Sequence, residues 1–335
     1  MDSLISVVMS VYNCDDYVTS AIESILNQSF RNIEFIIIND GSTDKSDEKI
    51  LMFNDPRILY IKNEKNIGLI GSLNKAILIS NGKYIVRMDA DDISVYNRIE
   101  RLVNFMDKNP DIGACSSYFE FGLETNNIIK YPVNDEEIYL NFLTGCPFGH
   151  APAILRKKVL IEHNLSYDTD FEHSEDSNLW VRMLNVTKLA NLPEILYRVR
   201  LHPGSITQLK KDQVQRSFNK SRNIHFKNIC NKLGEESEMV PFPGYNPSFD
   251  YLKGLGKKIL TLIGKNKKLG KFNSTMFEKY ISLLWMEIIN KNSPYKISNL
   301  FSLLSYRLIF YSDLRPRQKL NFIKKLILNS ILKSN

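Results

Sequence analysis

The chain has 335 residues, 43% of them hydrophobic, which is enough for one α/β domain with an appendage or for two domains. Its net charge of +7 is uneven, because residues 251–335 hold 17 Lys or Arg against three Asp or Glu, while residues 1–250 sum to −7. The four cysteines lie far apart without a CxxC pair, which argues against a zinc ribbon or a disulfide framework and favours a reducing compartment.

The sequence indicates neither secretion nor insertion into a membrane. The first residues lack a basic segment and run directly into a strand pattern, so we expect no secretory signal peptide. The longest apolar run, at 281–289, is interrupted by Ser282 and Glu287 and is far shorter than the roughly 20 residues that span a bilayer. We therefore expect a cytoplasmic protein that is not integral to a membrane.

Strand and helix patterns alternate through the first third of the chain. Strands are predicted at 4–9, 33–38, 58–61 and 84–88, and helices at 15–28, after Asp44, at 68–80 and at 99–106. Strands separated by helices of this length pair in parallel through right-handed crossovers. The turn after the first strand contains no glycine, which argues against a dinucleotide-binding Rossmann enzyme.

The polar turn NDGSTD at 39–44 follows the most apolar strand. In an open α/β sheet, ligands bind just outside the carboxyl ends of the strands. Asp40 could there accept hydrogen bonds from the N–H groups of a ligand such as a nucleotide base. The same residue types also build ordinary strand-to-helix turns with an N-cap, so both interpretations stay open.

Three carboxylates, those of Asp89, Asp91 and Asp92, follow the fourth strand. Carboxylates so close together repel one another unless a proton or a cation is present. A hard divalent cation held by one or two of them and by substrate phosphates removes that repulsion and neutralises charge on a leaving diphosphate. A second DxD triplet, at 168–170, has no strand before it, so position favours a metal site at 89–92 over a loop of solvated acids.

The second half of the chain is less regular. From 114 to 200 the pattern is mixed, with loops near 146–149 and a helix over 176–184. Residues 233–250 hold three prolines and two glycines and are predicted to link a domain at 1–232 to a basic helical region at 251–335.

Four motifs in order, SVVMSVYN at 6–13, NDGSTD at 39–44, NIG at 66–68 and DADD at 89–92, resemble those of the family 2 glycosyltransferases. The resemblance covers about residues 3–210, and within the domain at 1–232 it implies a donor half at about 1–113 and an acceptor half at about 114–232. It implies the GT-A fold, which is an α/β, Rossmann-related and mostly parallel sheet flanked by helices. It also implies a nucleotide-diphosphosugar donor, Mn²⁺ or Mg²⁺ as cofactor, and inversion at the anomeric carbon.

The resemblance assigns donor-side roles by residue. Tyr12 would stack on the base, and Asp40 would accept a hydrogen bond from the uracil N3–H. Asp91 would hold the metal on the diphosphate, with Asp89 near the ribose or the metal. The list of donor-binding residues is completed by Ser10, Asn66 and Arg200, of which Arg200 could pair with phosphate.

Inversion needs a base that takes the proton of the acceptor hydroxyl. Glu175 and Asp176 resemble the family's ED motif, so Asp176 is the predicted base and Glu175 lies on the acceptor side. An acid there could instead only favour the helix N-terminus, by about 0.3–1 kcal/mol. His150 lies in a segment that resembles one near the acceptor, but the altered order of Ala151 and Pro152 leaves its role open.

Two further features keep alternatives open. His202, in a Gly/Pro loop, could bind metal or phosphate or be simply solvated. Residues 317–335 predict an amphipathic helix that either docks on an anionic membrane or packs on the protein itself. Its apolar positions are Leu320, Phe322, Ile323, Leu326, Ile327 and Ile331, and its lysines are Lys319, Lys324, Lys325 and Lys333. Few arginines and no RNA or DNA module argue against nucleic acid as a partner.

These observations predict a metal-dependent, inverting hexosyl- or N-acetylhexosaminyl-transferase. It would move sugar from a UDP-sugar to a glycan or lipid-linked glycan in bacterial lipopolysaccharide, lipooligosaccharide or capsule synthesis, at the inner face of the plasma membrane. One alternative is a nucleotidyltransferase that forms nucleotide-sugars, although the chain lacks a Gly-rich basic loop near its N-terminus. The other is a non-catalytic, membrane-docked protein that binds sugar nucleotides.

Overall fold

The computed structural model describes residues 3–202, 210–237, 240, 247–292 and 316–332, with the backbone alone for 292, 318, 325 and 327–332. The chain forms two compact units, the first from residues 1–138 and 147–214 and the second from residues 139–146 and 215–335. Residues 203–205 of the Gly/Pro loop that contains His202, and residues 238–239 and 241–246 of the predicted linker, lie outside the described residues.

In the described part of the first unit, nine strands form one sheet in the order β3-β2-β1-β4-β8-β6-β9-β5, with β7 against β6. Strands β1 to β4 pair in parallel, as do β6 and β9, whereas β8 runs antiparallel to both β4 and β6. The strands are β1 (Ile5–Val11), β2 (Ile33–Asn39), β3 (Ile58–Lys62), β4 (Tyr84–Asp89), β5 (Ile93–Ser94), β6 (Ile112–Phe121), β7 (Ile128–Ile129), β8 (Ile154–Arg156) and β9 (Lys188–Val199).

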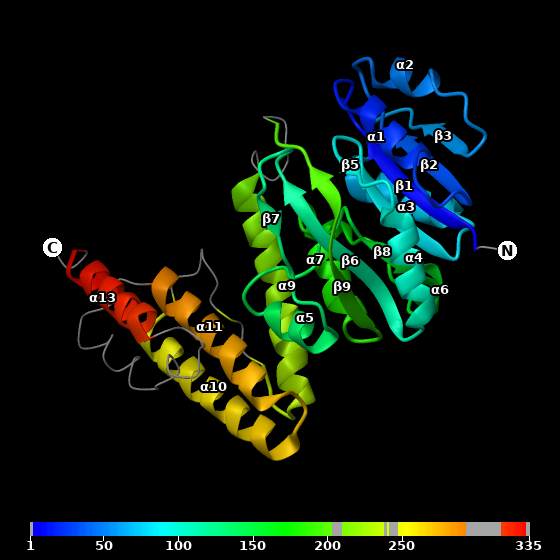
Figure 1. The fold of residues 1–335 in the computed structure, drawn as a ribbon. Helices are drawn as coiled ribbons and strands as arrows, with labels where there is room; N and C mark the ends of the chain where they lie inside the picture. Colours follow the sequence, from blue (N-terminus) through cyan, green and yellow to red (C-terminus); the bar gives the residue numbers. More distant parts are fainter. Residues whose placement is uncertain (1–2, 203–209, 238–239, 241–246, 293–315, 333–335) are drawn as a thin grey trace. The chain divides into compact units, whose positions relative to one another are not determined.

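Helices cover both faces of this sheet (Figure 1). The four helices predicted for the first third of the chain and the one predicted at 176–184 are confirmed, with ends shifted by a few residues. The helices of this part are α1 (Val18–Leu26), α2 (Ser46–Leu51), α3 (Gly68–Ile79), α4 (Arg98–Lys108), α5 (Asp135–Asn141), α6 (Lys157–Glu162) and α7 (Glu175–Met183), with a 3₁₀ turn at Thr169–Phe171.

The central strands are buried on both faces, which is why they read as continuous apolar runs. Val7, Phe35 and Val86 lie in register and belong to the core cluster that α1 and α4 complete. Val8 and Ile36, which point to the opposite face, are also buried, and α3 packs there against β1 and β2. Because buried side chains and helices fill both faces of the sheet, a ligand is expected at the polar turns that follow β1, β2 and β4 at its carboxyl edge.

The turn after β2 depends on Gly41. Its φ is +72°, and a Cβ added there would lie 2.9 Å from both the backbone N of Asn66 and the carbonyl carbon of Lys65. Only glycine fits this left-handed and crowded position without strain. The turn that follows β2 is thus packed directly against the turn that follows β3, and the two polar segments meet.

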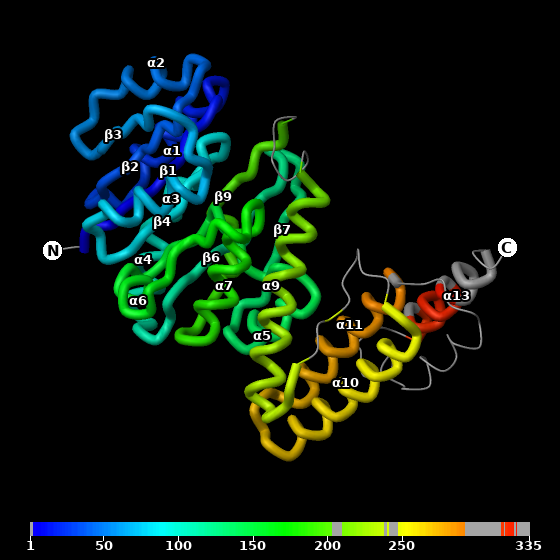
Figure 2. The backbone as a smooth tube through the Cα atoms, turned by 180° about the vertical axis from the view of Figure 1, so that it is seen from behind, coloured from blue at the N-terminus to red at the C-terminus, as the bar shows by residue number. Residues whose placement is uncertain are grey.

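The second unit is helical and contains α9 (Lys211–Lys232) from residue 215 onward, α10 (Phe249–Leu269), α11 (Ser274–Asn292) and α13 (Pro316–Leu332). Figure 2 shows α10 and α11 side by side, and the two helices pack against each other. Ser248 caps α10 by accepting a hydrogen bond from the Tyr251 N–H, and Gly270, at φ +59°, ends it. Among the described helices, none combines the length and apolarity that crossing a bilayer requires.

Candidate functional site at the carboxyl edge of the sheet

The strand register brings the predicted donor residues to one edge. Ser10, near the end of β1, lies opposite Ile38 on one neighbouring strand and opposite Asp89 on the other. Tyr12 is the first residue after β1 and is 50% exposed, so its ring is accessible to a ligand. The parallel pairing therefore places the polar turns that follow β1, β2 and β4 at one edge of the sheet, although they are far apart in sequence.

Asp40 is held rigidly in the turn after β2. It is 1% exposed, and its Oδ1 accepts hydrogen bonds from Asn63 Nδ2 at 2.8 Å and from the Ile67 N–H at 2.9 Å. Oδ1 accepts both of these hydrogen bonds. The predicted contact between Asp40 and the nucleotide base therefore depends on Oδ2. Asn66 uses its Oδ1 to accept from the Gly68 N–H at 2.9 Å, which orders the start of α3.

The loop that follows β1 is tied to the turn that follows β2. Asn13 Oδ1 accepts from the Thr43 N–H at 2.8 Å, and the Asn13 N–H donates to Ser42 Oγ at 3.1 Å. The Cys14 N–H donates to Ser46 Oγ at 2.8 Å. These bonds fix the position of Tyr12 relative to Asp40, the two residues predicted to contact the base.

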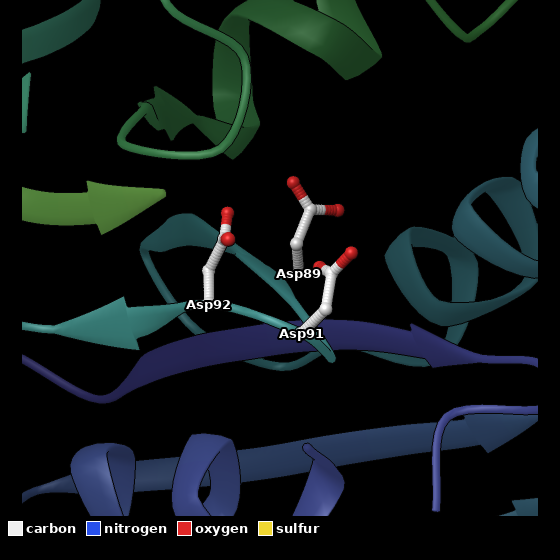
Figure 3. Close-up of side chains that lie close together, drawn as sticks. All are labelled: Asp89, Asp91 and Asp92. Carbon is white, nitrogen blue, oxygen red and sulfur yellow. The ribbon is translucent and has the colours of Figure 1, made fainter. Parts of the chain in front are cut away.

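Asp89, Asp91 and Asp92 form a compact group after β4. Each offers a carboxylate oxygen within 4.8 Å of the others, and Figure 3 shows all three side chains extending to the same side of the turn. Burial raises the pKa of Asp89 and holds that of Asp92 well above its usual range, and the charges within the group add to both shifts. A hard divalent cation fits this donor set and would relieve the repulsion.

The negative charge of this group is partly balanced by Arg87, which lies two residues before Asp89 in β4. Its side chain is 1% exposed, and its guanidinium lies 2.5 Å from Asp89 Oδ1. Arg98, also buried, donates to the Arg87 carbonyl at 3.1 Å and supports this end of β4. The sequence pattern did not lead us to either arginine, although a charged residue inside an apolar strand is itself a signal, because an unpaired charge is rarely buried.

The segment after β9 returns to the same carboxylates. The Arg200 N–H donates to Asp92 Oδ1 at 2.9 Å, and His202 Nε2 lies 2.8 Å from Asp91 Oδ2. The sequence led us to expect that Arg200 pairs with phosphate, and it left His202 open between a metal or phosphate contact and a solvated side chain. The structure places the Arg200 backbone N–H and the His202 ring beside the acidic group, whereas the Arg200 guanidinium contacts Ser20 and Tyr17.

Glu175 and Asp176 open α7. Burial and the neighbouring charge of Asp176 raise the pKa of Glu175 to about 7. Burial also raises the pKa of Asp176, while hydrogen bonds from Ser177, one of them at 2.6 Å from its N–H, oppose the shift. Ser174, rather than Asp176, occupies the N-cap position. A carboxylate whose pKa is raised toward neutrality is a better general base.

An aromatic group lies beside this pair. His150 Nε2 is 2.8 Å from the hydroxyl of Tyr167, and both rings pack edge-on, with His150 also against Trp180. Burial holds the pKa of His150 well below its usual range, so the ring is neutral. Burial also raises the pKa of Tyr167, and the charges of Glu175, Asp176 and Asp89 add to that shift, so the phenol lies within electrostatic reach of both acidic groups.

Tyr167 was not identified from the sequence. Its backbone N–H donates to Asn74 Oδ1 at 3.0 Å and its carbonyl accepts from Asn74 Nδ2 at 2.9 Å, which anchors the segment before α7 to α3. No motif marks the residue, because its importance comes from a contact between segments 93 residues apart. Only the fold could reveal it.

Comparison with known proteins gives a consistent result. Residues 6–164 match the model of the family described as glycosyl transferase family 2. An uncharacterized glycosyltransferase of Haemophilus influenzae is 31% identical over 97% of this chain and 96% of its own length. The Escherichia coli protein WfaP, named as a UDP-Glc:alpha-D-GlcNAc-diphosphoundecaprenol beta-1,3-glucosyltransferase, is 31% identical over 68% of this chain and 90% of its own length.

Among solved structures, the chain resembles Staphylococcus aureus TarS 1–349 in its complex with UDP-GlcNAc. The TM-score is 0.57 at 16% identity, over 97% of this chain and 89% of the other. At this identity the likeness concerns the fold alone. It confirms the predicted fold class, an α/β sheet flanked by helices with helices following at the C-terminus.

The raised pKa of Glu175 predicts how stability depends on pH. Its folded-state value of about 7 lies above the ordinary 4.5, so ionisation costs stability as pH rises between these values. Glu175→Gln removes this cost. Relative to wild type, the variant should gain stability from pH 5 to pH 8, by at most about 3 kcal/mol, in urea unfolding followed by fluorescence.

Glu172→Gln, three residues earlier and 76% exposed, is the matched control and should show no such trend. Equal pH trends for the two variants would contradict the buried, proton-retaining state of Glu175.

Proposed function

The chain belongs to glycosyltransferase family 2, and we propose that it is an inverting, metal-dependent enzyme that transfers a sugar from a UDP-sugar to a lipid-linked glycan. The observation that carries the proposal is the group of Asp89, Asp91 and Asp92 at the carboxyl edge of the sheet, whose carboxylate oxygens lie within 4.8 Å of one another, with His202 Nε2 2.8 Å from Asp91 Oδ2. A divalent cation at such a group would neutralise the charge that develops on a leaving diphosphate.

On the donor side, Tyr12 stacks on the base, and Oδ2 of Asp40 accepts the uracil N3–H. Ser10 and Asn66 line the same edge. Asp91, together with Asp89 and His202, would hold Mn²⁺ or Mg²⁺, and the cation would supply positive charge to the leaving diphosphate. Arg200 donates hydrogen bonds to the phosphates. The name of the relative WfaP, which includes a UDP-sugar donor, supports this assignment of the nucleotide.

On the acceptor side, Asp176 takes the proton of the acceptor hydroxyl while that oxygen attacks the anomeric carbon. The bond from the anomeric carbon to the diphosphate oxygen breaks, and UDP leaves with the electron pair. Because attack and departure occur on opposite faces, the anomeric configuration inverts. Glu175, which retains a proton near neutral pH, limits the negative charge beside the base, and neutral His150 lies where the acceptor enters.

The acceptor class is inferred from the relatives. WfaP and WfgD of Escherichia coli are both named for a GlcNAc-diphosphoundecaprenol acceptor. We infer a lipid-linked glycan of the same kind here, in the synthesis of a bacterial surface polysaccharide. No finding favours the nucleotidyltransferase alternative. The non-catalytic alternative is separated from the enzyme by the experiments below.

The donor site is tested by UDP release. Purified protein with Mn²⁺ should release UDP slowly from one or two members of a panel of UDP-sugars, and EDTA should stop it. Asp91→Ala should lower the rate on the order of 100-fold, because a proposed metal ligand is lost. Asp170→Ala, which changes an exposed residue of the DxD triplet that no strand precedes, is the control and should release UDP like wild type. Metal-independent release, or equal loss in both variants, would contradict the assignment.

The base is tested by separating binding from turnover. Asp176→Asn should bind UDP with Mn²⁺ within a few-fold of wild type by calorimetry, since the residue does not contact the nucleotide. Its transfer rate should fall by about 10²- to 10⁴-fold, the usual contribution of a general base. Turnover near the wild-type rate would exclude Asp176 as the base. Absence of turnover in wild type as well, with UDP binding intact for every acceptor, would favour the non-catalytic alternative.

The basic C-terminal region is proposed to dock on the inner, anionic face of the membrane. In α13, Leu320 is 50% exposed and Lys324 is exposed, whereas Leu326 is buried; the side chains of Ile327, Ile331, Lys325 and Lys333 lie outside the described residues. The protein should sediment with vesicles containing phosphatidylglycerol and not with phosphatidylcholine alone. Raising the salt concentration should weaken this binding. Equal binding to neutral vesicles, or none to anionic ones, would contradict membrane docking.

A further inference from the structure

Tyr17, in the loop before α1, contacts both residues that approach the acidic group from β9. The guanidinium carbon of Arg200 lies 4.9 Å from the centre of its ring, and the His202 ring lies 4.8 Å away at an angle of 38°. One aromatic side chain thus supports a cation and an imidazole that come from a segment more than 180 residues later.

The position of Tyr17 is fixed by the same loop that carries Tyr12. Its N–H donates to the Cys14 carbonyl at 3.1 Å, and Cys14 is in turn bonded to Ser46. The Asp15 N–H donates to Asp44 Oδ2 at 3.0 Å. The ring is therefore part of a loop anchored to the turn after β2, and it does not depend on the residues it supports.

Within the part of the chain that the structure describes, the side chains of Arg200 and His202 have few other restraints. Besides the ring, the side chain of Arg200 donates to Ser20 Oγ at 3.2 Å, and His202 meets Asp91. A cation over the face of an aromatic ring is attracted by the charge distribution of the ring, and more strongly when the pair is desolvated. Without the ring, both side chains would sample further rotamers, and a ligand would have to order them on binding.

We propose that Tyr17 is a positioning residue that seats Arg200 and His202 over the acidic group before the donor binds. Tyr17 touches neither the reacting atoms nor the carboxylates in this role. It links the base-binding loop to the groups that engage the diphosphate and the metal. The inference rests on the proposed donor site and adds to it a residue that neither a motif nor a relative assigns.

The first test compares affinities for UDP with Mn²⁺ by calorimetry. Tyr17→Leu keeps an apolar side chain and removes the ring, so it should weaken binding by about three- to tenfold. Tyr17→Phe keeps the ring and should bind within twofold of wild type. Tyr96→Leu, which removes a 64% exposed tyrosine from the same unit, is the matched control and should not change the affinity. Equal weakening in the Leu and Phe variants would overturn the role of the ring.

A double-mutant cycle separates positioning from general structural support. When Arg200 and His202 are both replaced by Ala, the further change Tyr17→Leu should weaken UDP binding less than twofold, because its two partners are gone. The same three- to tenfold effect in both backgrounds would overturn the inference and leave the donor site standing. Failure of wild-type protein to bind UDP with Mn²⁺ would instead reject the proposed function, and this inference with it.

Discussion

The structure depends on how negative charge is held at the end of β4. Three carboxylates would repel one another and destabilise a buried strand end, yet the fold gathers them within 4.8 Å. Arg87, buried in the strand and paired with Asp89, balances part of this charge, and the backbone N–H of Arg200 and the ring of His202 approach from β9. The remaining excess of negative charge is what the proposed divalent cation would neutralise.

A balance of charge also governs Glu175 and Asp176, the pair proposed for the acceptor side. The site is built from two halves of one sheet, with parallel β1 to β4 on one side and β6, β8 and β9 on the other. α7 brings Glu175 and Asp176 within electrostatic reach of Asp89 and Arg87, so the protonation of the pair depends on the charge at the donor side. Tyr167 and His150, both neutral, complete the surroundings of the pair without adding charge.

Much of the first third of the fold was predictable because its signals are local. The apolar runs of β1, β2 and β4 and the polar turns after them determine both the strands and the ligand edge, and each lies within a dozen residues. The second half was less predictable: β8 has three residues, and β6 and β9 have polar and apolar residues in mixed order. Arg87, Tyr17 and Tyr167 were missed for a related reason. Their significance lies in contacts between distant segments, and single residue types carry no motif.

The central claim is that this edge transfers a sugar with inversion. The most direct measurement is the anomeric configuration of the product, by NMR, after reaction of the accepted α-linked UDP-sugar with a GlcNAc-diphospholipid acceptor and Mn²⁺. The account predicts a new β-glycosidic bond. An α-glycosidic product would contradict single displacement with Asp176 as base, even if the donor site were correct.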